Sequence, residues 1–380
     1  MKFARYFLVI CGLFYWRSIA KSNNHPKLKP RIAVILPVDE SNFNAVGNVL
    51  NCMVKAVFDV WRQTGYEFEA EFFNDRRDTM QAASIAEEIA RKHFDVAIGT
   101  TLSSQALIVS RILDKNEVPF ITPLATHPDI VQGKKFSMRL PFNDELQGRL
   151  LAHYTHSLLP NVKKVLVIEN ASLPYSTFLS HKYEAQIKLL VPEIIVSKLK
   201  YIDGQFSKED VVKAYSDSQA DAVFVPLYSL DVAGSYSALA SVIKKNTLLL
   251  SSDGVGASGK LYNAMGPENK FLKFDFVQHN PKDFSGPYAK KFRALHLEKC
   301  SKYDLTMNSA SGFDLADSTL TALFSKGYRS NAASFKKVYM ALAYDGTLGK
   351  LQFGKDGEPE KPIHIYTIQN RSVIYKDSLK

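Results

Sequence analysis

The stretch DVAIGTTLSSQALIVSRIL, residues 95–113, contains the unit that decides the fold. It begins with the apolar run of a buried β-strand, which ends at Gly99. From Ser103 onward the apolar residues recur at helical spacing, so we expect a helix after a short loop. Apolar strands that alternate with helices are typical of a parallel sheet covered by helices on both faces.

The same unit recurs on both sides of this stretch. Apolar runs at 32–36, 68–73 and 118–121 predict strands, and periodic segments at 46–61 and 80–93 predict helices. The later segments follow the same pattern: strands at 165–168, 194–199, 222–225, 248–250 and 271–277, and helices at 143–159, 175–190, after 207 and at 232–243. Three further helices, near 287–297, 313–324 and 334–342, precede two final strands at 350–353 and 363–368, which flank a turn at 355–357.

Two helix starts carry capping signals. Asn143 is a plausible N-cap with acidic residues in the first turn of its helix. Ser207, with Asp210 three residues on, resembles a capping box.

The repetition predicts an α/β protein with two Rossmann-like, doubly wound lobes. We expect lobe 1 to comprise residues 28–142 plus 279–361, and lobe 2 residues 143–278 plus 362–380, joined by a hinge. Open parallel sheets bind ligands at the carboxyl ends of their strands. Two lobes that face each other there can enclose a ligand from both sides.

The first 20 residues predict a secretory signal peptide. Lys2 and Arg5 precede a short apolar run, FLVICGLFYW, and Ser18 to Ala20 provide small residues for cleavage. The alternative is a membrane anchor, but a run of about 10 residues is short of the roughly 20 that span hydrocarbon. We therefore expect a periplasmic mature protein that starts near Lys21.

Composition argues against several other classes. The chain is 46% hydrophobic and has a formal net charge of +10, without a low-complexity tract. The charge is spread along the sequence, whereas nucleic-acid binding requires a basic stripe. Cys52 and Cys300 remain after the signal peptide, and whether they pair is left open at this point.

The motif patterns favour neither catalysis nor a bound cofactor. Residues 254–259, GVGASG, match the dinucleotide fingerprint G-x-G-x-x-G, but only six residues separate them from Gly266-Pro267. That is too short for a crossover helix. The pattern S-x-x-K at 334–337 is frequent by chance, and there is no P-loop, G-x-S-x-G, H-E-x-x-H or metal-spaced cluster. We predict no enzyme activity, no cofactor and no metal site.

Small hydroxyl side chains and one acid follow several of the predicted strands. The loop at 99–104, GTTLSS, joins a strand to a helix start, where N–H groups and hydroxyls can bind a carboxylate, although Ser103 can instead simply cap the helix. Thr126 and the carbonyls before it can accept hydrogen bonds from an ammonium group. Asp253 follows a strand of the second series and requires a cationic partner in a dry environment. Tyr228 lies on the same rim. The combination suits a zwitterion.

These residues resemble the leucine/isoleucine/valine-binding family, the type I periplasmic binding proteins that serve ABC transporters. The ordered set that carries the resemblance comprises VAIG at 96–99 with Ser103-Ser104, ITPLAT at 121–126, Arg139 with QGR at 147–149, SDG at 252–254 and AYDG at 343–346.

The resemblance implies roles for eight positions. Ser103 and Ser104, with main-chain N–H groups, would hold the ligand carboxylate, and the Leu124 carbonyl and Thr126 its ammonium group. Asp253 would supply the counter-charge. Tyr175 and Tyr228 would line the site from the second lobe, and Val46 would lie near the ligand side chain.

The implied function is capture of an amino acid or a related small polar solute by hinge closure, followed by docking on a membrane permease. The alternative is a ligand sensor that signals through a protein partner. Neighbouring permease genes would favour transport, and regulatory neighbours would favour sensing.

Overall fold

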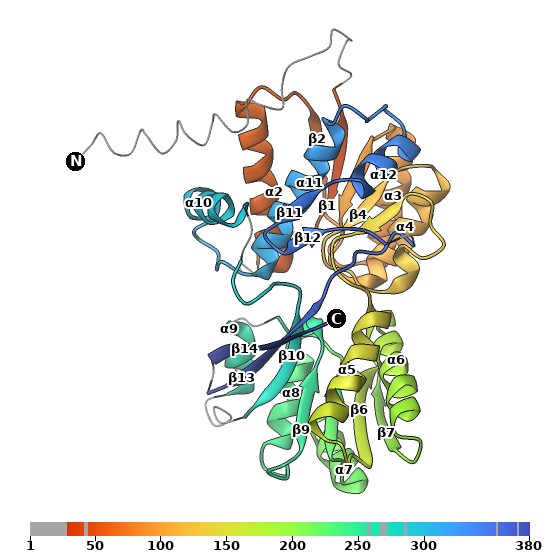
Figure 1. Cartoon of the computed structure of the whole chain (residues 1–380), viewed down its shortest axis with the longest axis vertical. Helices are drawn as coiled ribbons and strands as arrows, with labels where there is room; N and C mark the ends of the chain where they lie inside the picture. Colours follow the sequence, from red (N-terminus) through yellow and green to blue (C-terminus); the bar gives the residue numbers. More distant parts are fainter. Residues whose placement is uncertain are drawn as a thin grey trace, which may run out of the picture.

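The chain is represented by a computed structural model that describes residues 29–41, 45–256, 259–266, 272–284, 287–354, 356–370 and 372–380. Two halves lie one above the other in Figure 1, each built on a β-sheet with helices on both faces. The predicted α/β fold with two doubly wound sheets is confirmed. The predicted signal peptide, residues 1–20, lies outside the described residues.

The upper half contains a five-stranded parallel sheet in the order β2-β1-β3-β4-β5. Its strands are β1 (Arg31–Ile35), β2 (Glu69–Phe73), β3 (Val96–Gly99), β4 (Phe120–Thr122) and β5 (Ser137–Arg139). Its helices are α2 (Val46–Gln63), α3 (Thr79–Lys92), α4 (Ser103–Lys115), the short η2 (Pro128–Ile130), α10 (Ala289–Lys299), α11 (Met307–Leu323) and α12 (Ala332–Met340). The hairpin of β11 (Tyr344–Gly346) and β12 (Gly349–Leu351) completes this half.

Strand β1 shows why its sequence is apolar at successive positions. Ile32 and Val34 pack with α2, α10 and α11 on one face of the sheet. Ala33 and Ile35 pack with α3 and α4 on the other. All four side chains are fully buried, as expected for a strand covered on both faces.

The lower half contains a seven-stranded sheet in the order β14-β13-β10-β9-β8-β6-β7. Its strands are β6 (Lys164–Asn170), β7 (Ile195–Tyr201), β8 (Ala222–Val225), β9 (Leu248–Ser251), β10 (Phe274–Gln278), β13 (Ile363–Gln369) and β14 (Ser372–Leu379). Its helices are α5 (Asp144–Leu158), α6 (Pro174–Leu190), α7 (Lys208–Ser218), α8 (Ser229–Leu239), η3 (Asp253–Val255) and α9 (Gly259–Met265). Helices α5 and α6 cover one face, and α7, α8 and α9 cover the other.

Three predictions about elements need correction. The strand at 363–368 is not the last, because β14 follows and pairs with β13 in antiparallel orientation. The strand predicted at 350–353 ends earlier, since β12 comprises Gly349–Leu351 and pairs with β11. Ser207 caps α7 through the Asp210 N–H, but no reciprocal bond makes a capping box; Asn143 caps α5 as predicted.

The chain passes between the halves three times, after β5, after β10 and after β12. These crossings lie near the lobe boundaries predicted from the sequence, and the residue-level division into lobes stays a proposal. Each half therefore combines separated parts of the chain. The lower sheet contains β13 and β14 beside β6 to β10, and the upper half packs α10 and α11 against the sheet of β1 to β5.

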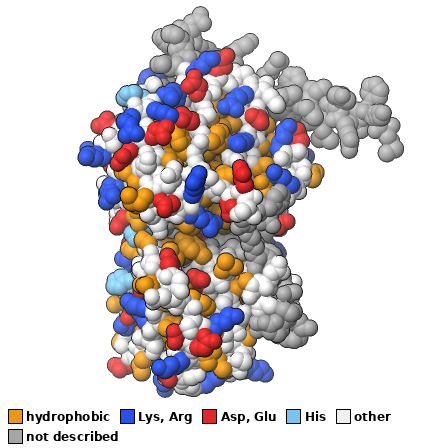
Figure 2. Space-filling view, turned by 180° about the vertical axis from the view of Figure 1, so that it is seen from behind, with side chains coloured by type: hydrophobic (Ala, Val, Ile, Leu, Met, Phe, Trp, Pro, Cys, Tyr) orange, Lys and Arg blue, Asp and Glu red, His pale blue; other side chains and the backbone are white. Residues whose placement is uncertain are grey.

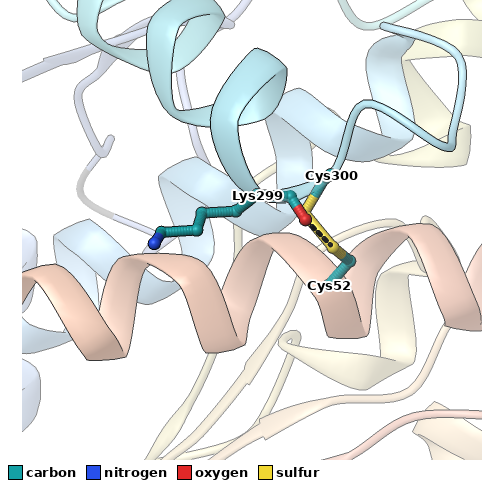
Figure 3. The surroundings of a disulfide bond; sticks show 3 residues. All are labelled: Cys52, Lys299 and Cys300. Atoms are coloured by element: carbon teal, nitrogen blue, oxygen red, sulfur yellow. Dashed lines mark hydrogen bonds between the residues drawn. A yellow bond between two sulfur atoms is a disulfide. The ribbon is translucent and has the colours of Figure 1, made fainter.

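A disulfide joins Cys52 on α2 to Cys300 at the end of α10, with the two Cα atoms 6.0 Å apart (Figure 3). The bond links residues separated by 248 positions. It settles the pairing that the sequence left open, and it is compatible with an oxidising compartment.

Charged side chains are mixed over the surface drawn in Figure 2. Basic and acidic groups alternate over both halves of this face, and no stripe of one sign gathers among its described residues. This agrees with the expectation that the net charge reflects a solvated surface. None of the helices in the described ranges has the length and apolar character needed to span a membrane.

Candidate functional site

The predicted site residues follow strands whose carboxyl ends meet between the two halves. The loops after β3 and β4 belong to the upper half, and those after β8 and β9 to the lower. Contacts across this region include the rings of His127 and Phe178, whose centroids lie 4.7 Å apart. Burial lowers the pKa of His127, so this contact is between neutral rings at neutral pH.

The loop between β3 and α4 is built around strained backbone. Gly99 has φ of +130°, and a Cβ there would lie 2.0 Å from the Ile35 carbonyl oxygen. The next residue, Thr100, is held in the left-handed region at φ of +51°. Only glycine tolerates the first of these positions, which turns the chain sharply from the strand into the helix.

The N-terminus of α4 has no side-chain cap. Leu102 occupies the N-cap position and cannot accept a hydrogen bond. Nearby, the hydroxyls of Thr100 and Thr101 are buried without a hydrogen-bond partner among the described residues. Unsatisfied buried hydroxyls beside free helix N–H groups form a site suited to a carboxylate.

Ser103 is the first residue of α4 rather than its cap. Its Oγ accepts a hydrogen bond from the His127 N–H at 3.3 Å, which ties α4 to the loop after β4. Simple capping, the alternative left open by the sequence, is therefore wrong. The residue that follows, Ser104, is half-buried in the first turn.

Arg139 shapes the loop that carries Thr126. Its buried guanidinium donates to the carbonyls of Ala125, His127 and Pro128, and its Nε lies 3.0 Å from Glu358 Oε2. One side chain thus holds both sides of Thr126 in place.

Asp253, the first residue of η3 after β9, is held by three side chains. Gln147 donates to its Oδ1 at 2.9 Å, the Tyr175 hydroxyl lies 2.7 Å from the same oxygen, and His279 Nε2 lies 3.0 Å from Oδ2. Burial raises the pKa of Asp253, but hydrogen bonding and charge from His279, with the bonds from Tyr175 and Gln147, outweigh it and hold the pKa below its ordinary value. Asp253 is therefore an ionised carboxylate at neutral pH.

Two tyrosines stack beside this acid. The rings of Tyr175 and Tyr228 are 5.3 Å apart and nearly parallel. The Tyr175 hydroxyl also lies 2.6 Å from Ser252 Oγ and accepts a hydrogen bond from the Gly254 N–H. Burial, followed by the charges of Asp253 and Asp144, raises the pKa of Tyr175 well above its usual range, so the phenol stays neutral.

The structure brings Ser103, Thr126, Asp253, Tyr175 and Tyr228 into one continuous region. Val46 and Leu124 are partly buried and pack against the apolar core of the upper half. Their places at the start of α2 and after β4 are those expected, and their roles toward a ligand stay predictions.

Sequence reasoning missed Asp144, Gln147 and His279. The Asp144 N–H donates to the Thr126 carbonyl at 3.0 Å, and Gln147 contacts both Asp144 and Asp253. The predicted cap at Asn143 explained Asp144 as an ordinary first-turn acid. The signal that could have found Asp144 and Gln147 is the segment from Arg139 to Gly148, which lies at a crossing between the halves. His279 follows β10, at the second crossing.

The dinucleotide motif is not supported by its context. Residues 253–255 form the short η3, and α9 contains seven residues. In the described part of the chain, no group of three or more His, Cys, Asp or Glu side chains is placed to hold a metal ion.

A family model described as periplasmic binding protein matches residues 30–372. The chain belongs to this family. The family is extracytoplasmic and consists of solute-binding proteins, so the predictions of the family and of a non-enzymatic role are confirmed.

Individual relatives agree with this assignment. This periplasmic binding protein is 25% identical over 304 residues to the Leu/Ile/Val-binding protein homolog 3 of Brucella melitensis, covering 78% of this chain and 79% of the relative. Its fold matches that of a leucine-binding protein, LivK, from Thermotoga maritima, with a TM-score of 0.79, 24% identity and coverage of 92% and 99%. It also matches a solute-binding protein of R. palustris in complex with benzoate, with a TM-score of 0.74, 13% identity and coverage of 92% and 96%.

Proposed function

We propose that this protein is the extracytoplasmic receptor of an ABC importer and captures an amino acid or a closely related small polar solute. Residues 1–20 would direct export, and a membrane permease would receive the loaded protein.

One observation carries the proposal: groups suited to opposite charges lie in the loops after the strands of the two halves. The upper half offers uncapped N–H groups of α4 and the hydroxyls of Thr100 and Thr101, which have no partner within the described part of the chain. The lower half offers the ionised Asp253 beside two stacked tyrosines. An α-amino acid carries a carboxylate and an ammonium group on one carbon, so it can satisfy both.

Hinge closure follows from this division of partners. A ligand held by groups from both halves binds the closed arrangement more tightly than the open one and shifts the population toward it. Closure also removes water from the charge pairs, which strengthens them.

The test is a thermal-shift screen of the purified mature protein against matched pairs of solutes. Each pair consists of an amino acid and the corresponding acid without its amino group, with benzoate as a further acid. We expect amino acids to raise Tm, since ligand at 100 times its Kd stabilises the folded state by about 2.7 kcal/mol. If no member of the panel raises Tm, the proposal is wrong.

A further inference from the structure

A second carboxylate lies beside Asp253. Asp144 begins α5 at the first crossing between the halves, and its side chain is fully buried. Its main-chain N–H is bonded to Thr126, and the Thr126 side chain lies beside the Asp144 carboxyl group. The position is thus adjacent to both residues that we assign to the ligand ammonium.

Gln147 fixes the relation between the two acids. Its Oε1 accepts a hydrogen bond from the Asp253 N–H at 2.9 Å, so its Nε2 must point the other way and donate. Nε2 lies 2.9 Å from Asp253 Oδ1 and 3.3 Å from Asp144 Oδ1. One neutral amide group therefore bridges two carboxyl groups.

The remaining oxygen, Asp144 Oδ2, is buried and has no well-formed hydrogen bond from any group in the described ranges. The cation nearest in the fold, Arg139, is already bonded to three carbonyls and paired with Glu358. A buried carboxylate oxygen without a donor requires either a proton or a cation.

The groups around Asp144 favour the proton when no ligand is bound. Burial, followed by the charge of Asp253, raises the pKa of Asp144 well above its ordinary value. The titratable or charged groups that surround the two acids are Arg139, Tyr175, Tyr228, His279 and Glu358. The two tyrosines are neutral, His279 contacts Asp253, and Glu358 contacts Arg139. These groups therefore do not supply enough positive charge to compensate two ionised carboxylates, Asp144 and Asp253, that lie close together.

We propose that Asp144 is a second ligand-binding carboxylate, and that a ligand ammonium group entering beside Asp253 and Thr126 replaces the proton that Asp144 holds in the ligand-free protein. The proposal rests on the proposed solute-binding function and adds a proton exchange to it. In the balanced step, the protonated Asp144 loses its proton to solvent, and the incoming ammonium group keeps all three of its own. The charge inside the site is then unchanged by binding at this position.

Proton release has a measurable consequence. Affinity for an ammonium-bearing ligand should rise with pH, by at most about tenfold per pH unit, until Asp144 is ionised in the free protein. Ligands that lack an ammonium group should show no such rise.

The experiment is calorimetric titration of the wild-type protein with the best amino acid from the screen, in several buffers of different ionisation enthalpy. We expect release of up to one proton per ligand at pH values where Asp144 is protonated in the free protein, and less release as the pH rises above that range. Asp144→Asn should abolish the release, flatten the pH dependence and weaken binding by about 10- to 100-fold at about pH 8, with a smaller loss at lower pH. Glu145→Gln is the matched control, because Glu145 is the neighbouring acid on α5, is exposed and pairs with Lys182, and it should behave as wild type.

A second measurement needs neither a variant nor tight binding. Difference infrared spectroscopy of the wild-type protein should show loss of one protonated carboxyl band when an amino acid is added. Amino-acid binding without proton release, or release that persists in Asp144→Asn, would overturn the proposal and leave the solute-binding function intact. If acids without an amino group bind and amino acids do not, the proposal is overturned as well. Absence of any solute binding would overturn the proposed function itself.

Discussion

At the scale of single residues, the two carboxylate oxygens of Asp253 have different roles. Asp253 orders the lower half by accepting bonds from Gln147 and Tyr175 on Oδ1. Among the described residues, its Oδ2 is contacted by His279, which leaves room for a further donor. The ligand ammonium would take that place.

We predict that Asp253→Asn weakens amino-acid binding by about 1–3 kcal/mol, the scale of a hydrogen bond to a charged group. Asparagine keeps the shape and can still accept bonds on Oδ1, but it lacks the negative charge. Calorimetry measures the change, and Asp210→Asn, at an exposed position on α7, is the control. Equal affinity for wild type and Asp253→Asn would remove Asp253 from the ligand site.

At the scale of elements, a sharp turn leads into α4, and the N-terminus of this helix has no side-chain cap. The turn at Gly99 brings the hydroxyls of Thr100 and Thr101 into the interior, where no described group forms a hydrogen bond with them. Such groups destabilise a fold unless a ligand completes their bonds. The element is thus arranged for binding rather than for stability.

The variant Thr101→Val should distinguish the contribution of this hydroxyl to ligand binding from its contribution to the stability of the fold. Valine has the same shape without the hydroxyl, so the free energy of unfolding should change by less than about 1 kcal/mol, while affinity for carboxylate-bearing ligands falls by about 1.5–3 kcal/mol. Chemical denaturation and calorimetry give the two values. Ser110→Ala, farther along the same helix, should leave affinity unchanged. A large loss of stability without a loss of affinity would assign Thr101 a purely structural role.

The disulfide acts between elements, since it joins α2 to α10 across a long stretch of chain. Replacing both Cys52 and Cys300 by serine should lower the free energy of unfolding by about 3–5 kcal/mol, because the unfolded chain gains the freedom of a long open loop. Denaturation with and without a reductant provides the control. Reduction should bring wild type to the level of the double variant and leave the variant unchanged. Equal stability in all four conditions would contradict the prediction.

At the scale of the whole molecule, closure depends on contacts between halves that need not touch the ligand. The His127 and Phe178 rings make one such contact, and Lys182 Nζ lies 5.3 Å from the centroid of the Phe178 ring. Contacts of this kind set the population of the closed state and so the apparent affinity.

Phe178→Ala should therefore weaken ligand binding by about 0.5–1.5 kcal/mol, the scale of one aromatic pair, mainly by faster dissociation. Stopped-flow kinetics measures the rate. Leu189→Ala removes an exposed apolar side chain from the same helix and is the control. An unchanged dissociation rate in Phe178→Ala would show that this contact does not contribute to closure.

The sequence by itself determined the alternation of strands and helices and the rims on which Ser103, Thr126 and Asp253 lie. These features depend on periodicity and on short-range turn chemistry, which neighbouring residues encode. The order of predicted strands and helices along the chain therefore predicted the fold class and the loops on which the proposed site residues lie.

Only the tertiary structure decided which distant residues meet. Gln147 and Asp253 are in contact although they are 106 positions apart, and Cys52 and Cys300 are bonded although they are 248 positions apart. Strand β14 is held in the sheet by its pairing with β13. The raised pKa of Asp144 likewise depends on its burial and on Asp253, a second acid that follows β9. Local pattern carries no information about such pairings, because they arise from how the two sheets pack around the three crossings.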